Sequence, residues 1–177
     1  MGKNKTSSIA LGGICLALTV IFIFAGSAVP GIELTLFAVS SLFTAVMIME
    51  SGVRGGIILY AAAVLLSIVI VPDKTAVIPY VFFFGYYGIL KFFTEKLGSA
   101  LLQLAAKALF FAVVLCISFI GFRELLLGSI SLPDYPVWIL IIAGVAMLLV
   151  YDYIYTLIIN FYLKRIRNRG ADNIKLS

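Results

Sequence analysis

Long apolar runs separated by short polar breaks are the dominant pattern along the chain. An α-helix rises about 1.5 Å per residue, so about 20 apolar residues cross a hydrocarbon core of about 30 Å. The pattern predicts an all-α polytopic membrane protein, a single membrane domain over residues 1–177 with a bundle of six transmembrane helices. The predicted helices, the third of them rather short, cover residues 9–29, 32–49, 57–71, 76–93, 97–122 and 137–163.

The breaks between these runs carry residues that end or bend helices. A proline-glycine turn at 30–31 separates the first two runs, and the glycine-rich segment 50–56 separates the next two. Within the fourth run, Pro79, Gly85 and Gly88 predict a kinked or partly unwound helix. The first run also fits a signal peptide, but it is long for one and the rest of the chain is itself apolar. A spanning helix is therefore favoured.

Composition supports a membrane bundle. Hydrophobic residues make up 63% of the chain and charged residues 12%, and a soluble domain of 177 residues could not bury so much apolar surface. The net charge of +5 does not indicate nucleic-acid binding, because the basic residues flank the apolar runs. Basic flanks of this kind can also attract the anionic head groups of a lipid bilayer.

The distribution of lysine and arginine predicts the orientation. With both termini in the cytoplasm, the cytoplasmic segments hold ten basic residues, whereas the outer connections hold only Lys74 and Arg123. The cytoplasmic set is Lys3, Lys5, Arg54, Lys91, Lys96, Lys164, Arg165, Arg167, Arg169 and Lys175. This asymmetry follows the positive-inside rule. We therefore expect a multi-pass protein of the plasma membrane, N-in and C-in, with a basic cytoplasmic tail over residues 164–177.

Little in the chain suggests catalysis, a cofactor or a metal. The sequence has no histidine, which removes histidine acid–base chemistry, haem ligation and most zinc sites. Cys15 and Cys116 lie inside apolar runs, where cysteine usually packs as a small hydrophobic residue. Nucleophile-elbow, phosphate-loop and paired-carboxylate motifs are missing from the sequence. We expect no enzymatic activity, no cofactor and no metal site.

Lys107 and Asp152 are the two ionisable residues that lie well inside predicted spans, at similar distances from the cytoplasmic ends. Asp152 shares a helix face with Thr156 and Asn160, and that face is expected to point into the bundle. One interpretation is an intramembrane ion pair that fixes the packing of the fifth and sixth helices, and another is a site that couples to a proton or ion. A third has Lys107 snorkelling to the inner interface, with Asp152 bonded to tyrosine hydroxyls or to Lys91.

An aromatic stretch over residues 82–88 lies near the middle of the fourth run. Aromatic side chains in a transmembrane helix usually face lipid or pack against other helices. The two glycines of this stretch can also expose backbone groups to a cavity, where tyrosines bind a ligand. Both interpretations stay open. Tyr80, Tyr135 and Trp138 lie near the outer boundary, where an aromatic belt accounts for them.

Four features within residues 8–95 occur in a characteristic order. They are the small-residue run Ile9–Ala17, the turn at 30–31, the glycine-rich turn Gly52–Gly56 and the Pro-Asp pair at 72–73. With this layout the chain resembles the substrate-binding S component of energy-coupling factor (ECF) vitamin transporters. The resemblance implies a small bacterial inner-membrane protein of six helices that captures a vitamin-like small molecule from outside. It also implies reorientation of the bundle when docked on partner subunits.

The resemblance implies positions for two surfaces. The first helix of that family carries a strip of the Ala-x-x-x-Ala type that docks on the membrane coupling subunit, and here Gly13 and Ala17 approximate it. The solute site of the family lies in the outward half, among helices four to six and the outer loops. On this chain that region contains Tyr80, Phe84, Tyr87, Arg123, Glu124, Asp134 and Trp138.

The leading hypothesis is an integral membrane solute-binding subunit of an ECF-type uptake transporter. The chain has no nucleotide-binding motif, so a partner coupling subunit and cytoplasmic ATPases would supply the energy. The alternative is a non-enzymatic membrane scaffold resembling MreD-type cell-shape proteins, which are also short, loop-poor helical bundles. A membrane enzyme that uses Asp152 with a tyrosine, or a transporter or channel that acts alone, has less support in the residues.

Overall fold

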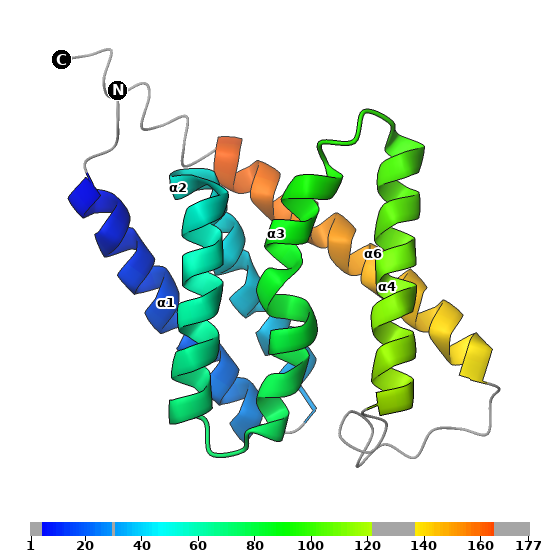
Figure 1. Cartoon of the computed structure of the whole chain (residues 1–177), viewed down its shortest axis with the longest axis horizontal. Coiled ribbons are helices and arrows are strands. Elements are labelled where there is room, and N and C mark those ends of the chain that lie inside the picture. Colours follow the sequence, from blue (N-terminus) through cyan, green and yellow to red (C-terminus); the bar gives the residue numbers. More distant parts are fainter. Residues whose placement is uncertain (1–4, 30, 122–136, 165–177) are drawn as a thin grey trace. The chain divides into compact units, whose positions relative to one another are not determined.

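The computed structural model describes residues 5–29, 31–121 and 137–164. Every regular element in these ranges is a helix, as Figure 1 shows, so the all-α prediction is confirmed for the described part of the chain. The elements are α1 (Lys5–Ala28), α2 (Glu33–Ile70), the 3-10 helix η1 (Thr75–Val77), the π-helix η2 (Tyr80–Phe84), α3 (Gly85–Thr94), α4 (Ala100–Gly121) and α6 (Val137–Tyr162).

The helices belong to two compact units: α1 to α4 form the first, and α6 belongs to the second. Within the described residues, four segments are long and apolar enough to cross a membrane, and α4 contributes a shorter apolar stretch, Leu101–Ile117. The four are Thr6–Ala28, Glu33–Ile70, Thr75–Thr94 and Ile141–Tyr162. Such helices satisfy their backbone hydrogen bonds internally, as a hydrocarbon environment requires. The chain is therefore built as an integral membrane protein.

One glycine divides α2, where the sequence predicted separate helices over 32–49 and 57–71. The element has 38 residues, and within it Gly52 has a non-helical backbone with φ 77° and ψ 178°. Glycine adopts this positive φ without the steric penalty of a Cβ. The chain turns back here, and the two halves of α2 run beside one another (Figure 1). The predicted break over 50–56 thus shrinks to a single residue.

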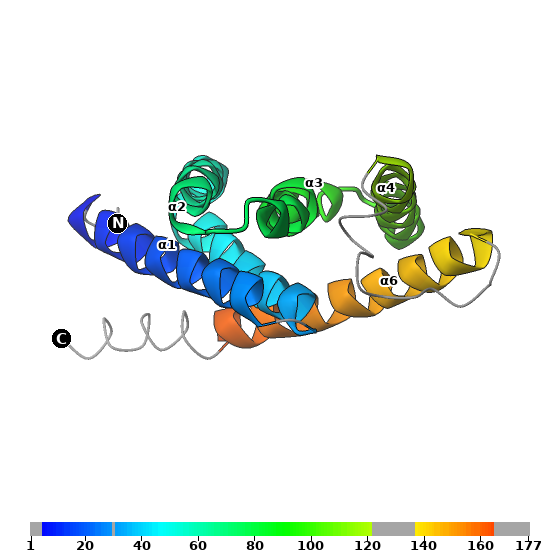
Figure 2. The same cartoon turned by 90° about the horizontal axis from the view of Figure 1, so that it is seen from below.

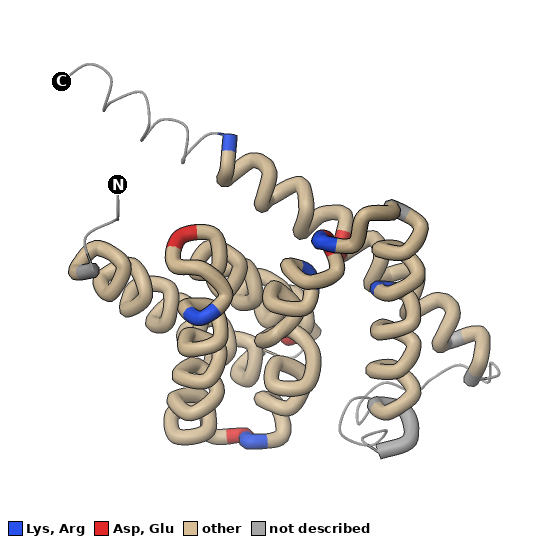
Figure 3. The backbone as a smooth tube through the Cα atoms, turned by 45° about the horizontal axis from the view of Figure 1, so that its top comes forward, with Lys and Arg blue, Asp and Glu red and all other residues tan. Residues whose placement is uncertain are grey.

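α1 packs along the first half of α2, an arrangement visible in Figures 1 and 2. Ile23 of α1 and Phe37 of α2 are buried, and the rings of Phe22 and Phe43 lie 5.8 Å apart. Most of the length of each described helix carries no charge, and charged residues gather near the turns of the first unit (Figure 3). This distribution is the one that a hydrocarbon environment favours.

The segment Thr75–Thr94 is one apolar span with an irregular backbone. It begins at a turn in which the Thr75 hydroxyl and N–H donate to Oδ1 of Asp73 over 2.6 Å and 2.9 Å, and these bonds lower the pKa of Asp73. The backbone is then 3-10 helical in η1, π-helical in η2 and α-helical from Gly85 onward. The Gly85 N–H donates to the Tyr80 carbonyl, five residues back. The irregularity agrees with the kinked or partly unwound helix that the sequence predicted.

Candidate functional site

Two buried lysines converge on one carboxylate where α3 leads into α4. Nζ of Lys91 lies 3.0 Å from Oε1 of Glu95, and Nζ of Lys107 lies 4.0 Å from the same oxygen. The lysine side chains are 2% and 8% exposed, whereas the Glu95 side chain is 43% exposed. The carboxylate therefore connects the interior of the first unit to its surface, and it links two helices.

The local sequence explains why these groups meet. Lys91 lies in the last turn of α3, where a cation interacts favourably with the helix dipole. The Glu95 N–H continues the helical pattern by donating to the Lys91 carbonyl over 2.9 Å. Early in α4, Nε2 of Gln103 reaches back and donates to the Leu97 carbonyl over 2.7 Å. These bonds hold the turn between the helices, so that Lys107 faces back toward α3.

The cluster compensates the charges of the two buried lysines. A buried ammonium group loses its hydration and needs an acceptor or a negative charge close by. Glu95 supplies such a charge to both lysines, and each lysine also takes part in a further interaction. The sequence analysis did not identify Glu95. Its four-residue spacing from Lys91 was the signal that could have found it.

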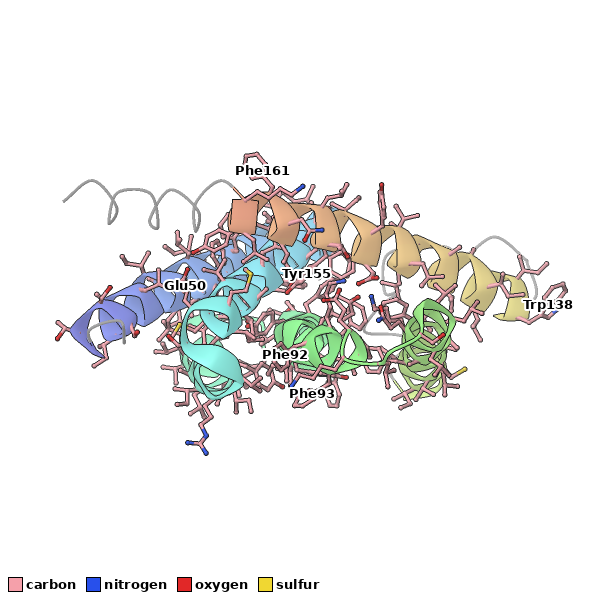
Figure 4. The ribbon with its side chains drawn as sticks, turned by 90° about the horizontal axis from the view of Figure 1, so that it is seen from above. Glu50, Phe92, Phe93, Trp138, Tyr155 and Phe161 are labelled. Atoms are coloured by element: carbon pink, nitrogen blue, oxygen red, sulfur yellow. The ribbon has the colours of Figure 1, made fainter. Side chains whose placement is uncertain are left out.

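The surface beside this cluster combines a cation with aromatic rings. Nζ of Lys96 lies 4.3 Å from the centroid of the Phe92 ring and 5.6 Å from that of Phe93. Phe93 is 55% exposed and points outward from α3 in Figure 4. A lysine and aromatic rings at the end of a transmembrane helix are typical anchors at a membrane–water boundary.

Aromatic rings fill the contact between η2, α3 and α4. The Phe83 ring lies 4.8 Å from Phe84, 5.6 Å from Tyr87 and 5.7 Å from Phe111. Tyr87 and Phe111 are themselves 5.7 Å apart. These contacts favour packing over ligand binding as the role of the buried rings in the stretch 82–88.

The predicted solute-binding residues fall into three groups. Tyr80, Phe84 and Tyr87 are buried, with exposures of 0%, 7% and 0%, and packing accounts for their burial. Trp138, near the start of α6, is 62% exposed (Figure 4). The remaining three, Arg123, Glu124 and Asp134, lie outside the described residues. A shared solute site for these seven stays a prediction.

The predicted docking strip and ion pair also stay predictions. Gly13 and Ala17 are exposed on α1, and a Cβ added at Gly13 would meet nothing within 4 Å. Lys107 belongs to the first unit and Asp152 to the second. Within α6, the Thr156 hydroxyl donates to the Asp152 carbonyl over 2.8 Å.

Among the residues that the structure describes, no group of three or more acidic, cysteine or histidine side chains could hold a metal ion. The chain matches no protein-family model, no curated protein and no solved structure.

Proposed function

We propose that this protein is the membrane-embedded, solute-binding subunit of an uptake transporter of the ECF type. It captures a small, vitamin-like molecule from outside the cell and has no enzymatic step of its own. A membrane coupling subunit and cytoplasmic ATPases supply the energy.

The irregular span Thr75–Thr94 is the observation that carries this proposal. A membrane helix that changes from 3-10 to π to α geometry departs from the simplest way to cross a bilayer. Short π-helical segments are frequent at functional sites, where they redirect side chains. The same span carries buried Lys91 in its last turn, and ionisable residues inside membranes commonly mark binding sites or pathways.

The proposed topology has six crossings, with both termini in the cytoplasm. The two halves of α2 are counted as separate crossings, because 38 residues of helix are about 57 Å long, nearly twice a hydrocarbon core of about 30 Å. α4 provides the fifth crossing and α6 the sixth. The excess of lysine and arginine in the cytoplasmic segments supports this orientation.

A scaffold resembling the MreD type is the second candidate, and one observation favours it. The rings of Phe83, Tyr87 and Phe111 pack together at the centre of the first unit, as expected of a bundle whose task is to be a rigid platform. In that case the exposed strip at Gly13 and Ala17 would contact another membrane protein.

Gentle affinity purification from native membranes, followed by mass spectrometry, separates the two candidates. Recovery of a membrane coupling subunit with ATPases supports the transport proposal, and recovery of cell-wall elongation proteins replaces it with the scaffold. A Gly13→Leu variant tests the strip on α1, because the added side chain projects into open space and leaves the packing within the chain unchanged. Loss of the partner from this variant, with unchanged melting, assigns the docking surface to α1.

A further inference from the structure

The two ends of the first unit treat their charged side chains differently. At the end where α2 leads into η1, Nζ of Lys74 donates to the Val71 carbonyl. The carboxylates of Asp73 and Glu33, in the turns at this end, each accept a backbone N–H over 2.9 Å. Within the described residues, the charged side chains at this end are therefore bonded by the chain's own backbone.

The opposite end carries two exposed basic residues without such bonds. The second half of α2 and the span Thr75–Thr94 pack together and run in opposite directions, so the turn at Gly52 and the turn after α3 lie at this same end (Figure 1). Arg54 follows the first turn and Lys96 lies in the second, and both are exposed. Among the described residues, neither has a carboxylate within ion-pair distance. The two charges are thus available to an external anion.

The ammonium group of Lys96 is held in place but keeps its hydrogen-bond donors. Its backbone N–H donates to the Phe93 carbonyl over 3.2 Å, which fixes the turn. Nζ then lies over the rings of Phe92 and Phe93, at 4.3 Å and 5.6 Å from their centroids. An aromatic face attracts a cation but offers no acceptor atom, so the N–H groups of the ammonium can still donate to phosphate oxygens.

An exposed apolar side chain accompanies each cation, one helical turn closer to the middle of the membrane helix. Phe93 precedes Lys96 by three residues and is 55% exposed, and Ile58 follows Arg54 by four residues and is 68% exposed. Spacings of three and four place such pairs on the same side of a helix. Each pair therefore presents a positive charge at the helix end and an apolar surface below it, which is the arrangement that a phospholipid with a negative head group complements.

We propose that this end of the first unit binds anionic phospholipid. The phosphates lie at Lys96 and Arg54, and the acyl chains lie along Phe93 and Ile58. Basic side chains at a membrane surface attract anionic lipid, and the planar guanidinium group of arginine also matches the geometry of a phosphate. The inference goes beyond the proposed function, because a solute-binding subunit and a scaffold meet the same bilayer.

Native mass spectrometry of the full chain in detergent, after delipidation, tests the proposal. Phosphatidylglycerol and phosphatidylcholine with identical acyl chains are added in turn, and the bound fraction is measured for each. We expect phosphatidylglycerol to bind about tenfold more tightly or better, since each basic residue near the surface contributes about fivefold. Equal affinities would overturn the proposal. Displacement of the lipid by an equal concentration of soluble glycerol phosphate would also overturn it, because the surface would then bind a free anion.

Three variants place the contact. Lys96→Gln and Arg54→Gln should each weaken the binding of phosphatidylglycerol by about fivefold and leave that of phosphatidylcholine unchanged. Lys74→Gln is the matched control, because it removes one positive charge from an exposed turn at the opposite end, where the ammonium is already bonded. It should leave the lipid affinity unchanged. Full affinity in the first two variants, or an equal loss in all three, would refute the proposed surface.

Discussion

Replacing Gly85 by alanine tests how closely α2 packs against the span Thr75–Thr94. An added Cβ would lie 2.5 Å from Cε2 and 2.6 Å from Cδ2 of Tyr60, and 2.9 Å from the Tyr80 carbonyl oxygen. Tyr60 cannot retreat freely, because its hydroxyl is bonded to the Val81 carbonyl over 2.9 Å. The Tyr80 oxygen belongs to the π-helical backbone and accepts the Gly85 N–H.

The expected effect is the difference of two terms. Overpacking typically costs about 1–3 kcal/mol, whereas exchanging glycine for alanine within a helix gains about 1 kcal/mol. Because a ring and a backbone oxygen would both have to move, we expect the cost to prevail. Gly85→Ala should lower the free energy of unfolding by up to about 2 kcal/mol.

The assay is equilibrium unfolding of the purified protein in detergent, with Gly13→Ala as the matched control. Gly13 is also a helical glycine, but a Cβ added there meets nothing within 4 Å. Gly13→Ala should therefore raise the free energy of unfolding by up to about 1 kcal/mol. If Gly85→Ala is as stable as the unaltered chain or more stable, the close packing of Tyr60 on Gly85 is refuted.

Three further predictions concern a hydrogen bond, a turn and an ion pair. Tyr60→Phe should lower the free energy of unfolding in detergent by about 1 kcal/mol, because the hydrogen bond from its hydroxyl to the Val81 carbonyl of η2 is lost. The control Tyr86→Phe should change the free energy of unfolding little. Equal effects of the two substitutions would contradict the role of this hydrogen bond. Gly52→Ala should cost about 1–3 kcal/mol, because its φ of 77° is strained for alanine, and an unchanged melting temperature would rule this out. If Lys107 and Asp152 pair, Asp152→Asn should destabilise the bundle, and adding Lys107→Met to that variant should partly restore its stability. Additive effects of the two substitutions in a double-mutant cycle would exclude the pair.

The apolar runs predicted several helices well. The run 137–163 corresponds to α6 (Val137–Tyr162), and the run 9–29 corresponds to α1, which begins four residues earlier at Lys5 and ends at Ala28. Long apolar stretches leave the backbone few alternatives to helix in a bilayer, so periodicity and length are informative. Pro79 predicted irregularity in the fourth run, but it did not predict the sequence of 3-10, π-helical and α-helical segments.

The turn within α2 could be predicted only in part. The segment 50–56 has three glycines, and each could in principle adopt a positive φ. In the structure the turn lies at Gly52, and helical geometry continues on both sides of it. Composition shows that a turn is possible and does not show which residue makes it.

The charged cluster was hidden for a similar reason. Lys107 was identified from its depth in an apolar run, but depth along one helix does not reveal what faces it on another. Glu95 lies in the turn after α3, and only the approach of α4 brings Lys107 within 4.0 Å of it.

Native mass spectrometry of the protein released from its own membranes tests the central claim most directly. A solute-binding subunit should carry a stoichiometric small-molecule adduct that fragmentation identifies as neither lipid nor detergent. The adduct should be lost on exhaustive dialysis and regained when a membrane-free extract is added. A bare protein mass under every condition, with no adduct regained from the extract, would contradict the account.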